Sequence, residues 1–198
     1  MKYIIYLHGF NSSSQSEKAR ITQKYFNDRY GSELSVIVPD LPPAPLEAMS
    51  SVHDLIKIHG RDNLIGFIGS SLGGFYSLYL QDFYATSSYF PKAALINPAV
   101  HPYNLLQDYI GENQNMYTGE TYMIHADHMA DLKSLDVQPI SKPQCTYLLT
   151  QTGDEVLNYQ EAVHRLSTAK MWIQFSGNHA FEGYLSTLPS IENFFVSG

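Results

Sequence analysis

Short apolar runs recur along the chain, separated by polar or glycine-containing stretches. They lie at Tyr3–Leu7, Leu34–Val38, Leu64–Ile68, Ala93–Ile96, Thr146–Leu149 and Met171–Phe175. Runs of this length without strict alternation are typical of strands that are buried on both faces, as in a parallel sheet. The pattern therefore predicts a mostly parallel sheet of about six strands.

Helical patterns occupy the intervals between these runs. Ser14 and Glu17 have the spacing of a capping box, which predicts a helix that turns Ala19, Thr22 and Phe26 inward. Further helices are predicted over 45–60, Leu72–Tyr84, Asn158–Leu166 and, as two short helices divided at Pro189, Phe181–Val196. Strands that alternate with helices indicate an α/β fold with helices on both faces of the sheet.

One segment, 98–144, interrupts the alternation and is too long for a simple connection between core strands. We expect a single α/β domain over 1–198 in which 98–144 is a small lid insertion. The lid carries an adaptable set of apolar side chains: Tyr103, Tyr109, Met116, Tyr117, Tyr122 and Met123. These side chains either line an acyl pocket or cover the core, and the pattern is compatible with both.

Composition and charge narrow the class of protein. Hydrophobic residues make up 44% of the chain, which argues against disorder. A formal net charge of −7 argues against nucleic acid or an anionic membrane as the main partner. Cys145 is the single cysteine, which excludes an internal disulfide and predicts a reducing, cytoplasmic location.

The uncharged stretch Asn63–Gln81 has the length of a membrane span, but glycines and serines break its apolar runs. A buried strand that leads into a buried helix explains it better, because a span needs about 20 mostly apolar residues. The apolar run after Lys2 is also too short for the hydrophobic part of a signal peptide. We therefore expect neither a signal peptide nor a membrane span.

A candidate nucleophile lies between the third predicted strand and the helix that follows it. Gly69–Gly73 matches the pattern G-x-S-x-G, and only Ser71 occupies its centre. In a sharp strand-to-helix turn this pattern exposes the serine hydroxyl as a nucleophile. A glycine-rich turn that binds phosphate or packs tightly is the alternative. The flanking strand and helix favour the nucleophile.

A nucleophilic serine needs an adjacent base, which a third group orients. On this fold an acid and then a histidine follow the serine, each after the carboxyl end of a strand. Asp154 and His179 have these positions. Two other carboxylates remain candidates for the acid, because Glu155 is adjacent to Asp154 and Asp40 follows an earlier strand.

The first predicted strand leads into a His8-Gly9 turn. One backbone N–H from this loop and one from the residue after the nucleophile would bind the negative oxygen of an acyl-transfer transition state. We assign these donors to Phe10 and Leu72, and we assign His8 to shaping the turn.

Histidines in the predicted lid also have the spacing of metal ligands on one helical face, at His125 and His128 with Asp131. A second cluster is missing from the sequence, so we expect solvated polar side chains and no metal. Cys145 is expected to be an inert, small apolar residue at the start of a buried strand.

These residues together resemble the YqiA-type esterases, which are small bacterial α/β hydrolases. The matching stretches cover most of the chain: Tyr6–Ser13, Leu41–Pro43, Gly69–Gly74, Asn97–Val100, Tyr117–Gly119, Gln151–Leu157 and Gly177–Phe181. The resemblance implies an α/β-hydrolase fold, with Ser71 as nucleophile, Asp154 as acid and His179 as base. It also implies hydrolysis of carboxylic esters or acyl thioesters, which are small-molecule substrates, without a metal or an organic cofactor.

The expected reaction is acyl transfer to Ser71, followed by hydrolysis of the acyl-enzyme. Peptidases and acyltransferases use the same three residue types, so both remain alternatives at this point. An α/β-hydrolase fold that is catalytically silent and binds a ligand or partner is the alternative from another class. The complete set of Ser71, Asp154 and His179 disfavours it.

Overall fold

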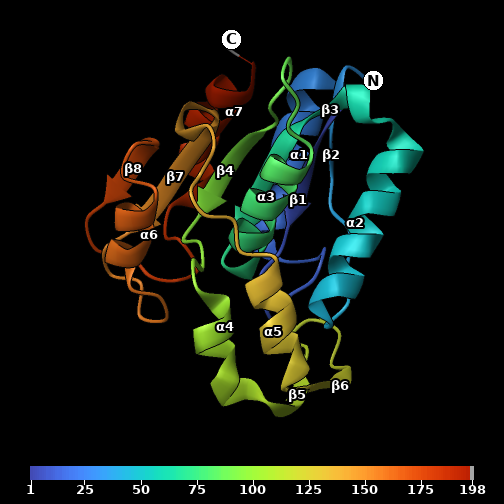
Figure 1. The fold of residues 1–198 in the computed structure, drawn as a ribbon. Coiled ribbons are helices and arrows are strands. Elements are labelled where there is room, and N and C mark those ends of the chain that lie inside the picture. Colours follow the sequence, from blue (N-terminus) through green and yellow to red (C-terminus); the bar gives the residue numbers. More distant parts are fainter. Residues whose placement is uncertain (197–198) are drawn as a thin grey trace.

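Six parallel strands form the central sheet of the computed structural model, which describes residues 1–196 (Figure 1). In their order across the sheet they are β2 (Leu34–Ile37), β1 (Lys2–Leu7), β3 (Leu64–Ser70), β4 (Lys92–Ile96), β7 (Thr146–Gln151) and β8 (Lys170–Gln174). Every neighbouring pair in this sheet is parallel. The predicted parallel sheet is confirmed.

Helices cover both faces of the sheet. Helices α1 (Glu17–Tyr30) and α7 (Leu188–Val196) pack on one face, and α2 (Pro45–His59), α3 (Leu72–Phe83) and α6 (Tyr159–Arg165) pack on the other. Strand β1 shows why its apolar run is continuous. Ile4 and Tyr6 join the core under α1 and α7, while Tyr3, Ile5 and Leu7 join the core under α2 and α3. The α/β fold with two helical layers is confirmed.

The predicted helix boundaries are wrong in two places. Helix α1 begins at Glu17, so Ser14 is not its N-cap; instead, the Ser14 N–H donates to the Asp40 carboxylate at 2.7 Å. The C-terminal helices divide before Leu188, between the 3₁₀ helix η4 (Tyr184–Thr187) and α7. Pro189 lies in the first turn of α7, where its missing N–H breaks no helical hydrogen bond.

Strands β2 and β8 lie at the two edges of the sheet, and β8 differs from the other predicted strands in the exposure of its side chains. The exposed fraction is 36% for Trp172, 46% for Ile173 and 90% for Phe175, which lies just past the end of the strand. The prediction of burial on both faces is therefore wrong for this strand.

Segment 98–144 extends beyond the end of the sheet at which the strands finish, and its last residues lead back to the start of β7 (Figure 1). It contains α4 (Pro102–Leu105), the 3₁₀ helix η2 (Leu106–Tyr109), an antiparallel hairpin of β5 (Gly111–Gln114) and β6 (Thr121–Ile124), and α5 (Asp127–Ser134). Short 3₁₀ helices also precede β3 and β7, as η1 (Arg61–Asn63) and η3 (Pro143–Cys145). Within residues 1–196, no helix has the length and apolar character needed to cross a membrane.

Candidate active site

Ser71 occupies the sharp turn between β3 and α3. Its φ is +55°, a left-handed value that side chains other than glycine rarely adopt. A Cβ at Gly69 would lie 2.2 Å from the Gly73 carbonyl oxygen, and one at Gly73 would lie 2.0 Å from the Leu7 carbonyl oxygen. Glycine is thus required on both sides of Ser71 for the turn to pack against β1.

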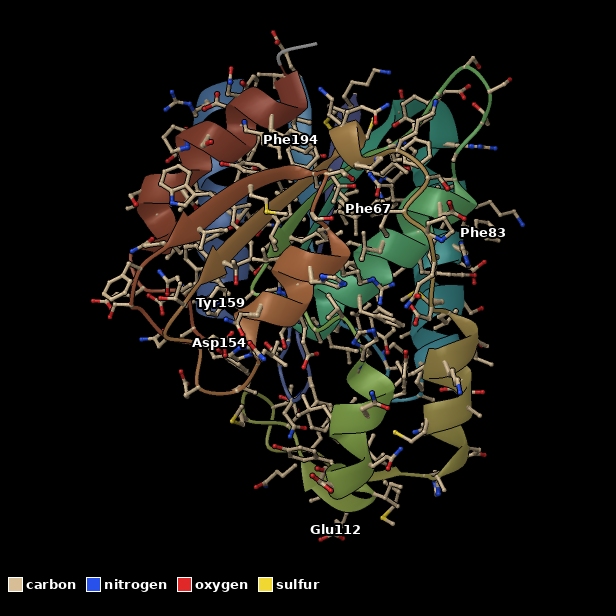
Figure 2. The ribbon with its side chains drawn as sticks, turned by 60° about the vertical axis from the view of Figure 1, so that its left-hand side comes forward. Phe67, Phe83, Glu112, Asp154, Tyr159 and Phe194 are labelled. Atoms are coloured by element: carbon tan, nitrogen blue, oxygen red, sulfur yellow. The ribbon has the colours of Figure 1, made fainter. Side chains whose placement is uncertain are left out.

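The structure brings Ser71, His179 and Asp154 together from three separate loops. His179 Nε2 lies 3.2 Å from Ser71 Oγ, and His179 Nδ1 lies 2.8 Å from Asp154 Oδ2. A carboxylate only accepts hydrogen bonds, so Nδ1 carries the proton and Nε2 is free to accept the serine proton. Figure 2 shows Asp154 beside the start of α6, at the edge where the strands end.

The Asp154 carboxylate is almost completely buried, with 2% of its side chain exposed. Burial raises its pKa, but hydrogen bonds from His179 and from the backbone N–H groups of Leu157 and Val156 outweigh this, so the pKa is lower than usual. These N–H groups lie 2.8 and 2.9 Å from Oδ1. Asp154 is therefore ionised beside the imidazole.

The two other candidate acids have different partners. Glu155 Oε2 accepts the backbone N–H of His179 at 3.0 Å, so this side chain contacts the main chain of the histidine. Asp40 binds the Ser14 N–H, in the loop before α1. Among the three carboxylates, only Asp154 faces the imidazole of His179.

Two buried amides hold the histidine loop, and no motif in the sequence points to them. Asn97 Oδ1 accepts the Gln151 N–H at 2.9 Å, and its Nδ2 donates to the carbonyls of Asn178 and His179 at 3.0 and 3.3 Å. Gln151 Oε1 accepts the N–H groups of Asn178 and Glu182. Both amides lie at the end of a buried strand. A polar residue at that position stands out in the sequence, so this feature could have identified both side chains.

The His8-Gly9 turn lies directly against Ser71. A Cβ at Gly9 would be 3.1 Å from the Ser71 Cβ. His8 Nδ1–H donates to the Gly9 carbonyl at 2.9 Å, and Nε2 accepts the Leu41 N–H at 3.1 Å. Burial lowers the pKa of His8, which favours this neutral, bridging form.

The two backbone N–H groups assigned as oxyanion donors belong to the residues that follow Gly9 and Ser71 in the chain. Phe10 follows Gly9 in the loop, and Leu72 is the first residue of α3. Among residues 1–196, neither backbone N–H has a hydrogen-bond partner, as the first N–H of a helix has none within the helix. Both groups are therefore available to a ligand.

A cleft of about 950 Å³ opens beside these donors. Its lining includes the polar side chains of Asn11, Asp40 and Asn115 as well as Leu72 and Tyr122. The volume is that of a small-molecule site.

The apolar side chains of segment 98–144 have different positions. Tyr122 lines the cleft and Tyr103 packs on the core, whereas Met116, Tyr117 and Met123 are exposed. Part of the set thus lines the cleft or covers the core, and part of it is exposed.

The two histidines of segment 98–144 contact one another, and the expected solvation is wrong for His128, which is buried. The rings of His125 and His128 lie 5.3 Å apart, edge to face. In the part of the chain that the structure describes, no group of three or more His, Cys, Asp or Glu side chains surrounds a common point. Cys145 lies in η3, just before β7, and is partly buried.

Comparisons with known proteins relate the chain to one protein family and to several solved structures. A family model described as "Uncharacterised protein family (UPF0227)" matches residues 3–196. Est1E from Butyrivibrio proteoclasticus, solved with ferulic acid bound, has a TM-score of 0.72 and 14% identity, with 98% of this chain and 88% of that chain covered. Mouse alpha/beta hydrolase domain-containing protein 10 has a TM-score of 0.70 and 17% identity, with 96% and 88% covered. At such identities these similarities show the α/β-hydrolase fold alone.

Proposed function

The chain belongs to the UPF0227 family of YqiA-type proteins, and we propose that it is a serine hydrolase that cleaves acyl esters or thioesters. The observation that carries the proposal is the continuous chain of hydrogen bonds from Ser71 through His179 to Asp154, at 3.2 and 2.8 Å. A serine held this way can lose its proton to the imidazole as it attacks a carbonyl carbon.

The first half of the reaction forms an acyl-enzyme. Ser71 Oγ attacks the carbonyl carbon, and its proton moves to His179 Nε2. Ionised Asp154 stabilises the imidazolium, while the N–H groups of Phe10 and Leu72 bind the negative oxygen of the tetrahedral intermediate. The intermediate collapses as the C–O or C–S bond breaks, and the alcohol or thiol leaves with the proton from His179.

Water completes the cycle. His179 removes a proton from a water molecule, which attacks the acyl-enzyme and forms a second tetrahedral intermediate. Collapse of this intermediate returns the proton to Ser71 and releases a carboxylic acid. Every group in these steps belongs to the chain, the substrate or water.

The position of the cleft supports this proposal, and the cysteine content bears on the compartment in which the enzyme acts. The cleft beside the donors has room for a small-molecule ester and lies at the carboxyl ends of the strands, where open α/β sheets place their sites. The single cysteine, Cys145, is consistent with a reducing compartment, so we place the enzyme in the cytoplasm.

A panel of p-nitrophenyl esters and acyl thioesters of graded chain length tests the proposal, with Ser71→Ala as the blank. We expect turnover of part of the panel by the wild-type chain and none above the blank by the variant. Absence of turnover across the panel, or cleavage of peptide amides without cleavage of esters, would contradict the proposal. Equal turnover by Ser71→Ala would remove Ser71 from its role.

A further inference from the structure

The hairpin β5–β6 of segment 98–144 is bonded to the loop that follows β1. The Met116 N–H donates to the Asn11 carbonyl at 3.2 Å, and Asn115 Nδ2 donates to the Ser12 carbonyl at 2.8 Å. The Tyr122 hydroxyl donates to Asn11 Oδ1. Three hydrogen bonds thus connect residues far apart in sequence to the two residues directly after Phe10.

The same segment also packs on Phe10 itself. The ring of Tyr109 lies 5.2 Å from that of Phe10, edge to face, and the ring of Tyr122 lies 6.4 Å away at 82°. Such aromatic pairs restrict the position of the central ring. Contacts from 98–144 therefore fix both the side chain of Phe10 and the backbone that follows it.

The backbone of this loop is left-handed at Asn11, where φ is +53°. Asparagine tolerates this conformation better than most residues other than glycine, and the contacts from the hairpin hold the loop in it. The amide of Asn115 is itself oriented, since its Oδ1 accepts the N–H groups of Tyr117 and Thr118 at 2.9 and 3.1 Å. Its Nδ2 is consequently directed at Ser12 by the hairpin turn.

We propose that Asn115 and Tyr122 are positioning residues for the oxyanion hole, which hold the Phe10 N–H in place through the loop 10–12. The inference rests on the proposed serine hydrolase function. Oxyanion donors act because they are aligned before the reaction begins, and a displacement of about 1 Å costs on the order of 100-fold in rate. The hairpin thereby acts on catalysis without contacting the reacting atoms.

Two minimal variants test the proposal. Tyr122→Phe keeps the ring that packs on Phe10 and removes the hydroxyl, while Asn115→Asp keeps the acceptor of the turn and removes the donor to Ser12. We expect each to lower kcat on the best ester of the panel by about tenfold or more, with KM changed by less than about threefold. The rate of reaction with a fluorophosphonate should fall in parallel with kcat.

Matched controls are available in the same segment. The Tyr103 hydroxyl donates to Asp136 at 2.9 Å, and Ser134 Oγ donates to the Asp131 carbonyl at 2.7 Å; neither bond involves the hairpin or the loop 10–12. Tyr103→Phe and Ser134→Ala should keep kcat within about twofold of wild type. Burst titration of active sites in each variant gives kcat per functional molecule.

The outcomes separate the two proposals. If wild type hydrolyses esters in a Ser71-dependent way while Tyr122→Phe and Asn115→Asp keep full kcat per active site, the positioning role is wrong. A loss of activity that is explained by fewer active sites, or that is shared by the controls, also overturns it. If wild type shows no Ser71-dependent turnover, the proposed function fails instead.

Discussion

Replacement of Asn97 by alanine tests how the histidine loop is held. Asn97 is 1% exposed, and its amide binds the Gln151 N–H and the carbonyls of Asn178 and His179. The variant removes all three hydrogen bonds and leaves the backbone groups without these partners. The structure therefore predicts a loss of stability together with a loss of activity.

The magnitude follows from the burial of these groups. A buried N–H or C=O that loses its partner costs about 1–3 kcal/mol, and water can reach the partly exposed carbonyls of Asn178 and His179. We expect Asn97→Ala to lower the free energy of unfolding by about 2–4 kcal/mol. For a chain of 198 residues this corresponds to a fall in Tm of about 5–15 °C.

Urea denaturation and ester hydrolysis measure the two effects. The kcat of folded Asn97→Ala should fall by about 10–100-fold, since the His179 imidazole is no longer held toward Ser71. Asn27, which is exposed on α1, offers a matched control, and Asn27→Ala should change the free energy of unfolding by less than about 0.5 kcal/mol. If Asn97→Ala unfolds at the same urea concentration as wild type with unchanged kcat, the argument from its three bonds is refuted.

Three further predictions concern the loop after β1 and the acid. Phe10→Pro removes a proposed oxyanion donor and should lower kcat by about 10²–10³-fold, whereas Phe10→Ala keeps the N–H and should change KM more than kcat. Asp154→Asn should lower kcat by about 10⁴-fold, because an amide no longer stabilises the protonated form of His179. Burial lowers the pKa of His8, so its contribution to stability should be present above about pH 6.5 and lost as the pH falls through its native pKa. Urea denaturation between pH 5 and 8 should therefore show a steeper loss at low pH for wild type than for His8→Gln.

Each of these predictions has a result that would contradict it. Phe10→Pro that is folded by circular dichroism and keeps more than about a third of wild-type kcat would place the donor elsewhere, most directly at Asn11. Asp154→Asn with nearly full kcat would return the role of acid to another carboxylate. Equal pH dependence of unfolding for wild type and His8→Gln would show that His8 titrates alike in folded and unfolded chains.

Most of the strands were predictable because their apolar runs supply side chains to both helical layers. In β1, alternate residues enter the two cores, so the pattern of a doubly covered strand is visible in the sequence. The exposure of Trp172 and Phe175 was not predictable in the same way. The order of strands across a sheet depends on long-range pairing, and an edge strand such as β8 can have the same local pattern as a central one.

The same distinction applies to the candidate site: features within one turn were predictable from the sequence, and contacts between distant segments were not. Ser71 was identifiable because glycines flank it within one turn, and His179 because it follows a strand. Asp154 and Glu155 differ by one position, and only the path of the loop decides that one faces the imidazole ring and the other the backbone. The buried amide of Asn97 binds the Gln151 N–H at the end of β7 and the Asn178 carbonyl in the histidine loop. The local sequence around Asn97 does not show that these groups come together.

The reactivity of Ser71 toward a fluorophosphonate tests the central claim most directly. The probe forms a covalent bond to an activated serine, and mass spectrometry of peptides locates the adduct. We predict one adduct at Ser71 in wild type, loss of ester hydrolysis in proportion to labelling, and slow or no labelling of His179→Ala. An adduct at the neighbouring Ser70, or no adduct in a folded protein, would contradict the proposal that His179 activates Ser71.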